Sequence, residues 1–211
     1  MPASRRGTAT ATLADAVSEA RSGDIWLFRG RTVADRAIRL STNAPVNHVA
    51  LCLAIDDLPP LLWHAELGHS TPDVWTGTSH RGAQLHRLED AARTWVLRYG
   101  QRAYARHMEP PATNELEDAA LAVVQDYSGR PFPRSRQLAK HWVLGRLHRR
   151  VSLQDLYCAE LVAVTLQRMG LLGDERPPNW YDPGRFWSGD QLTLLNGVTL
   201  GPEVTVDVPP R

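Results

Sequence analysis

Apolar and polar positions follow two different periods along the chain, and each period predicts a different kind of element. Near-continuous apolar runs predict buried strands at residues 23–30, 48–55 and 61–67. Period-two alternation predicts two further strands at residues 83–88 and 94–100. Because most of these strands follow one another closely, we expect an antiparallel sheet in the middle of the protein.

Apolar positions also recur at helical spacing before, between and after these strands. They predict helices at residues 10–21, 32–42, 114–128 and 136–150, and a last helix that begins near "YCAELV" and ends at Gly170. A tail rich in Pro and Trp, residues 177–191, is expected to wrap over the core, and "LTLLNGVTL" to add a last strand or hairpin. This order of elements predicts an α+β fold with a central antiparallel sheet packed against helices.

The composition is that of an ordinary globular protein. With 211 residues and 43% hydrophobic positions, the chain suits a single domain over residues 1–211, with a core at about 22–190. A net charge of +1 argues against nucleic acid as a partner. The sequence shows neither an apolar signal-peptide segment nor a run long enough for a transmembrane segment, so we expect a cytoplasmic protein.

The chain has two cysteines, which do not make a disulfide framework. Cys52 lies inside the apolar run "HVALCLAI", where a buried and inert thiol is the usual outcome. Cys158 lies near the start of a helix, and it would be the third helical residue if Asp155 caps that helix. There the free backbone N–H groups and the helix dipole would favour a thiolate and lower its pKa. A core-filling role for Cys158 stays open on this pattern alone.

A reactive thiol needs a base, and two of the eight histidines have suitable places. His48 begins an apolar strand, at the rim of the predicted sheet, and His64 lies within the next strand, where it could orient the ring of His48. The other six histidines fall in predicted loops or on helix faces. A zinc site from Cys52, His64 and His69 matches no common ligand spacing, so we expect no metal.

Three stretches together resemble a known family: "GDIWLFRG", "NHVALCLAI" and "CAELV". They are similar to the circularly permuted papain-like proteins of the NlpC superfamily, which include the YiiX-like group and the lecithin retinol acyltransferase group. A histidine early in the chain and a cysteine late in it is the order typical of the permuted branch. The usual serine before that histidine is Asn47 here, a departure from the pattern.

The resemblance implies a papain-like fold with circularly permuted topology, and it implies roles for individual residues. Cys158 would be the nucleophile, His48 the base and His64 the third residue, with Glu66 as the alternative third residue. Tyr157, beside the nucleophile, would contribute to the oxyanion site.

The function that the resemblance implies is a cysteine hydrolase, most simply an amidase or peptidase that works through a Cys thioester with a His base. A lipid acyltransferase or thioesterase is the alternative, and a catalytically inactive ligand-binding module is another. Neither a metal nor an organic cofactor is implied. The substrate would be a small molecule, a peptide or a lipid, and the oligomeric state stays open.

Overall fold

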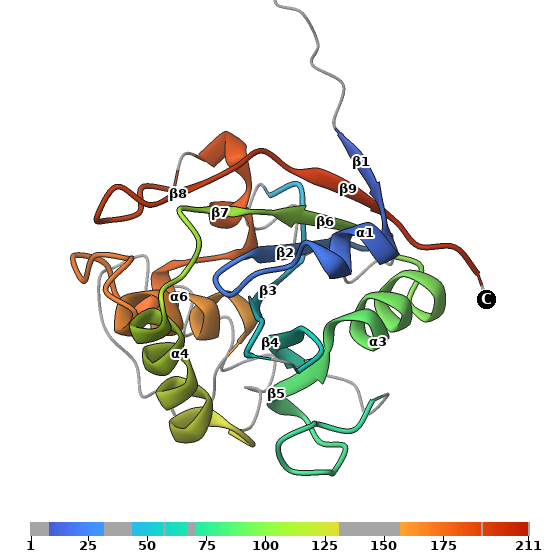
Figure 1. Ribbon diagram of the computed structural model, residues 1–211, viewed down its shortest axis with the longest axis horizontal. Coiled ribbons are helices and arrows are strands. Elements are labelled where there is room, and N and C mark those ends of the chain that lie inside the picture. Colours follow the sequence, from blue (N-terminus) through green and yellow to red (C-terminus); the bar gives the residue numbers. More distant parts are fainter. Residues whose placement is uncertain are drawn as a thin grey trace, which may run out of the picture.

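The computed structural model describes residues 9–31, 44–56, 58–66, 71–130, 157–190 and 192–210 (Figure 1). The predicted helices at 32–42 and 136–150 lie outside these residues. Among the described residues, no helix is both long enough and apolar enough to cross a membrane.

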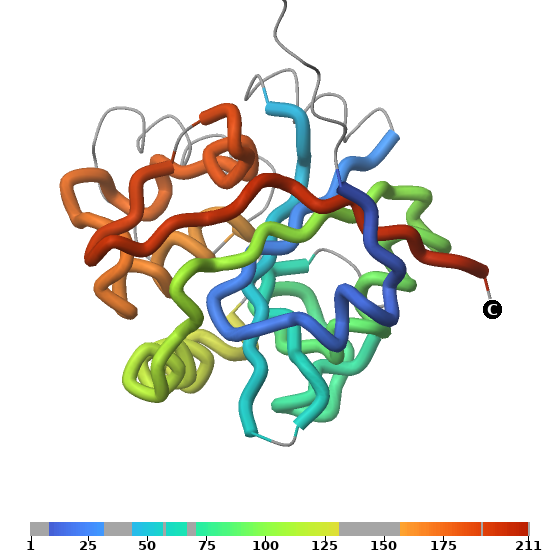
Figure 2. The backbone as a smooth tube through the Cα atoms, turned by 45° about the horizontal axis from the view of Figure 1, so that its top comes forward, coloured from blue at the N-terminus to red at the C-terminus, as the bar shows by residue number. Residues whose placement is uncertain are grey.

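A seven-stranded sheet forms the centre of the protein, in the order β1-β9-β6-β2-β3-β4-β5. Its strands are β1 (Thr10–Thr12), β2 (Ile25–Arg29), β3 (His48–Leu53), β4 (Leu61–Glu66), β5 (Gly82–Arg87), β6 (Arg102–Arg106) and β9 (Val204–Asp207). All neighbours are antiparallel except β1 and β9, which run parallel and bring the two ends of the described chain together (Figure 2). A small second sheet pairs β7 (Met108–Glu109) with β8 (Thr199–Leu200).

Helices cover both faces of the sheet (Figure 1). The longer helices α4 (Asn114–Tyr127) and α6 (Cys158–Arg168) pack on one face. The short helices α1 (Leu13–Ser18) and α3 (Leu88–Arg93) lie on the other, where α3 continues into one turn of π-helix, η1 (Thr94–Arg98). Three short 3₁₀ turns follow α6 in the tail: η2 (Pro178–Trp180), η3 (Pro183–Phe186) and η4 (Ser188–Asp190).

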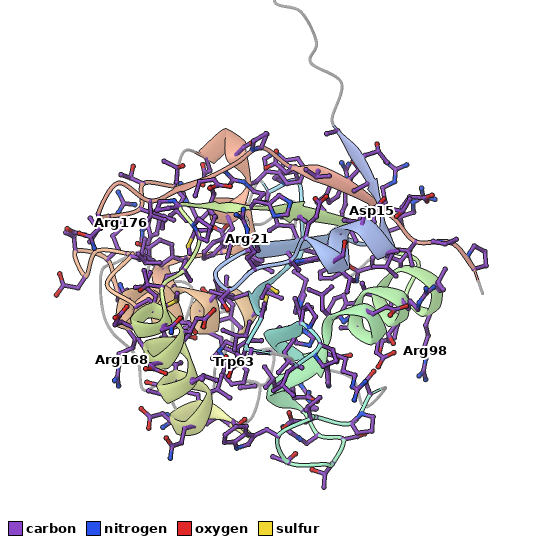
Figure 3. All side chains as sticks on the ribbon, in the orientation of Figure 1. Asp15, Arg21, Trp63, Arg98, Arg168 and Arg176 are labelled. Carbon is purple, nitrogen blue, oxygen red and sulfur yellow. The ribbon has the colours of Figure 1, made fainter. Side chains whose placement is uncertain are left out.

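Each central strand therefore faces two hydrophobic cores, because successive side chains point to opposite sides of a sheet. In β3, Val49 and Leu51 pack in the core under α6, whereas Ala50 and Cys52 pack in the core under α3. We call these sides the α6 face and the α3 face. Trp63, labelled in Figure 3, packs on the α6 face. Its indole Nε1 donates a hydrogen bond to Thr165 Oγ1 on α6, 3.2 Å away, and so ties the helix to β4.

The fold agrees with the predicted α+β class and with a central sheet of mainly antiparallel strands. The strand predicted at 94–100 is wrong, because these residues form η1 instead. Trp95 is buried there while Leu97 is exposed, so the alternating pattern described two sides of a short helix rather than two faces of a sheet. The prediction also missed β6 and β9. In β6, arginines stand at both ends, Arg102 and Arg106, and they hide the apolar positions between them.

Candidate functional site

Three buried histidines from three adjacent strands form a chain of hydrogen bonds on the α3 face. His48 Nε2 lies 3.0 Å from His64 Nδ1, and His64 Nε2 lies 2.9 Å from His86 Nδ1. The three side chains come from β3, β4 and β5, whose pleat and register turn them to the same side. Each contact joins two ring nitrogens, so each holds one shared proton between neighbouring rings.

Aromatic side chains enclose His48, at one end of this chain. The ring of His48 stacks on Trp95 with centroids 3.9 Å apart, and it also packs against Phe28. Burial favours the neutral form of an imidazole. Desolvation accordingly lowers the pKa of His48 to about 3, lowers that of His64 well below its usual value, and lowers that of His86. The histidine chain is therefore neutral at pH 7, and buried His48 is a weaker base than a free imidazole.

The carboxylate of Glu66 lies beside His86, at the other end of the chain. Its Oε2 lies 3.8 Å from His86 Nδ1, and its Oε1 accepts a hydrogen bond of 3.1 Å from the Tyr99 hydroxyl. It is His64, rather than Glu66, that the structure places on Nε2 of His48.

Cys158 lies where the strands β3 and β4 part. Their ladder runs from Leu53↔Leu61 to Leu51↔Trp63 and ends there, although β3 extends back to His48 and β4 continues to Glu66. The backbone N–H of Val49, the residue next to His48, favours the thiolate form of Cys158. Cys158 packs on the α6 face and the ring of His48 on the α3 face, beside this interruption of the ladder.

The thiol and the histidine chain do not hydrogen-bond to each other in the described part of the chain. The backbone N–H groups of Cys158 and Ala159 also favour the thiolate, as expected at a helix start. Burial outweighs them and raises the pKa of Cys158 to about 11. The expected lowering of this pKa is therefore wrong, since the sequence does not reveal that the helix start is buried. The helix also begins later than expected, with Tyr157 as N-cap and Cys158 as its first residue.

Two neighbours of Cys158 have environments that the sequence did not suggest. The Tyr157 hydroxyl donates to the backbone carbonyls of Asn179 and Tyr181, so its ring fastens the tail to the start of α6 and does not offer a free donor to an oxyanion. Glu160 is completely buried, and burial raises the pKa of its carboxyl to about 8, against the opposing effect of the Tyr157 backbone N–H. Neither carboxyl oxygen has a hydrogen-bond partner among the described residues.

The prediction missed His86 and Trp95. His86 falls within the strand predicted at residues 83–88, but that prediction gives it no role; it lies on β5 and bonds to His64. The signal was present in "AQLHRL", where Gln84 and His86 alternate with apolar residues and so share one face of the strand. Trp95 lay in the segment mistaken for a strand, which hid its position above His48.

Known proteins show no match in sequence and a partial similarity in structure. No family model matches the chain, and no curated protein is similar to it in sequence. A crystal structure described as the metalloprotein YiiX of Escherichia coli O157:H7 is similar, with 17% sequence identity and a TM-score of 0.48. The match covers 71% of this chain and 66% of that one, slightly less than two thirds of its length. Permuted papain-like topology and kinship to the acyltransferases stay predictions.

Proposed function

We propose that the protein is a cysteine-dependent hydrolase that cleaves an amide bond through a thioester on Cys158, with His48 as the base and His64 as the residue that orients it. The observation that carries this proposal is the way His48 is held. Its Nε2 is 3.0 Å from His64 Nδ1, its Nδ1 has no hydrogen-bond partner among the described residues, and the backbone N–H of its neighbour Val49 favours the thiolate of Cys158.

The chemistry follows from these contacts. His48 Nδ1 takes the proton from the Cys158 thiol as the sulfur bonds to the acyl carbon, and His64 holds the ring. The C–N bond then breaks, and the leaving amine takes that proton from His48. Water, deprotonated by the same ring, attacks the thioester and releases the acid, while the sulfur regains a proton. The backbone N–H groups of Val49, Cys158 and Ala159 favour negative charge on the sulfur, and in this proposal they also donate to the oxyanion.

The resting thiol is neutral in this proposal. Since burial raises the pKa of Cys158 to about 11, the proton must move during the attack and not before it. This distinguishes the proposed site from one that stores a thiolate–imidazolium pair.

The test is acylation of the thiol by an activated ester. The full chain is incubated with p-nitrophenyl acetate, and the acetylated peptide is located by mass spectrometry before and after hydroxylamine, which cleaves thioesters. We expect acetyl transfer to Cys158 and p-nitrophenol release in excess of one equivalent. Release should be lost in Cys158→Ala and kept in the matched variant Cys52→Ala. A folded wild-type protein that is not acetylated would instead be a binding module, and the proposal fails.

An ester of lipid type is the second candidate substrate, and one surface feature favours it. Val74 and Trp75 are 49% and 55% exposed, side by side in the segment between β4 and β5. Exposed apolar side chains of this size often mark contact with an apolar ligand. Replacing acetate by decanoate in the same assay separates the two, because an acyl-chain enzyme gains rate with chain length and loses that gain in Trp75→Ala.

A further inference from the structure

The His86 end of the histidine chain offers a set of metal ligands, separate from Cys158. His64, Glu66 and His86 each offer one ligand atom, and these atoms all lie within 4.8 Å of one another in a buried position. Two imidazoles and one carboxylate are a common ligand set of zinc and of other divalent transition metals.

The strands hold these three side chains in one place. His64 and Glu66 are two residues apart on β4 and so point to the same face, and His86 comes from the neighbouring strand β5. Ligands on paired strands are fixed by the sheet, which is the rigid support that a metal site needs.

The distances suit a metal ion better than a closed network of hydrogen bonds. His86 Nδ1 and Glu66 Oε2 are 3.8 Å apart, too far for a hydrogen bond, and His64 Nε2 and His86 Nδ1 are 2.9 Å apart. Two ligands of a tetrahedral ion at about 2.0–2.1 Å are separated by about 3.4 Å, between these two values. Shifts of about half an ångström would therefore convert the cluster into a coordination site.

In two of these ligands, the polar atom that would not bind the ion already has a hydrogen-bond partner of the kind that supports metal binding. The other ring nitrogen of His64, Nδ1, lies 3.0 Å from His48 Nε2. Glu66 has its other oxygen, Oε1, on the Tyr99 hydroxyl at 3.1 Å. Such partners fix the tautomer of a ligating histidine and the orientation of a ligating carboxylate.

We propose that His64 Nε2, His86 Nδ1 and Glu66 Oε2 bind one divalent transition-metal ion, zinc before the others, on the α3 face of the sheet. The ion replaces the proton between His64 and His86. Neutral His64 then carries its single proton on Nδ1 and donates it to His48 Nε2. A neutral His48 accordingly carries its own proton on Nδ1 and does not act as the base while the ion is bound. The site revises the expectation from sequence that the protein holds no metal, and it does not depend on the thiol chemistry of Cys158.

The experiment is a zinc titration of the full chain after treatment with a chelator and dialysis. Calorimetry should give one Zn²⁺ per chain, with binding weakened at least 100-fold in His86→Ala and in Glu66→Gln. The matched variant His107→Ala should bind as wild type does, because His107 bonds to Asp24 away from this cluster. Cys158→Ala should also keep full zinc affinity, so loss of the acylation site and loss of the metal site are distinguishable.

Cobalt gives a readout that does not require the variants to fold. X-ray absorption of the Co²⁺-loaded wild type should show two imidazole nitrogens, oxygen ligands and no sulfur. Sulfur among the ligands would overturn the proposal, as would a folded wild type that binds neither ion. Unchanged zinc affinity in both His86→Ala and Glu66→Gln would overturn it as well. If wild type binds no zinc while His86→Ala slows acylation of Cys158, the three histidines form only a proton relay.

Discussion

The buried polar groups on the two faces of the sheet differ in their hydrogen bonding. On the α3 face, three histidines are bonded in a row, and Glu66 is bonded to Tyr99. In the α6 layer, the thiol of Cys158 is buried, and the oxygens of Glu160 have no hydrogen-bond partner in the described part of the chain. A buried network in which the members satisfy one another fixes a geometry, whereas an isolated buried group mainly has its protonation shifted. The first face is suited to orienting a base, and the second to holding a neutral acid.

The strongest test of this division is removal of the base. We expect His48→Gln to slow acetyl transfer to Cys158 by about 10²–10⁴-fold, the usual contribution of a general base. The glutamine fills much of the same space beside Trp95 but cannot take a proton. Acetylation is followed by peptide mass spectrometry, with His107→Gln as the control. An unchanged rate would mean that the two faces do not cooperate.

The next prediction concerns the buried carboxyl of Glu160 and the pH dependence of stability. Burial raises the pKa of Glu160 from 4.5 to about 8, so the folded state holds this proton more tightly than the unfolded state does. Its contribution to stability is complete below about pH 4.5 and is lost as the pH rises to about 8. In Glu160→Gln we expect this loss, roughly 2–5 kcal/mol in the free energy of unfolding, to disappear.

Urea unfolding at pH 5 and pH 8 measures this difference in wild type and variant. Glu117→Gln, on α4, is the control and should unfold as wild type does at both pH values. Equal pH dependence in wild type and Glu160→Gln would mean that the carboxyl of Glu160 is paired and charged in the folded protein.

The two thiols provide a third comparison, one on each face. Cys158 has a pKa of about 11, so its thiolate fraction at pH 8 is about 10⁻³, roughly a hundredfold below that of an ordinary cysteine. We expect its alkylation by iodoacetamide to rise about tenfold per pH unit between pH 8 and 10. Cys52 is wholly buried and should react only after unfolding. Peptide mass spectrometry gives both rates, and fast alkylation of Cys158 at pH 6 would show a stabilised thiolate instead.

The smallest effect concerns the attachment of α6 to the sheet. Thr165→Val leaves the buried indole N–H of Trp63 without its acceptor, and we expect a loss of about 1–3 kcal/mol in the free energy of unfolding. Thermal or urea unfolding measures it. The double variant with Trp63→Phe should lose less than the sum of the two single variants, because the unsatisfied donor is gone. Strict additivity would indicate that this hydrogen bond does not contribute.

The sequence by itself determined the parts of the protein whose signals are local. Near-continuous apolar runs located β2 to β4, period-two alternation located β5, and helical spacing located α4 and α6, because buried elements carry their apolar residues in local patterns. The same patterns located His48 at the start of a strand and Cys158 near the start of a helix, and the order of the two carried the resemblance to permuted papain-like proteins.

Only the tertiary structure decided which of these residues meet and what state they are in. That β3 and β4 part after Leu51↔Trp63, that His86 reaches His64, and that Trp95 covers His48 all depend on strand register and on packing between distant segments. The pKa of Cys158 depends on the same packing. A helix start favours the thiolate in any sequence, but burial by residues far along the chain reverses that preference, since desolvation is a property of the assembled fold and not of the local motif.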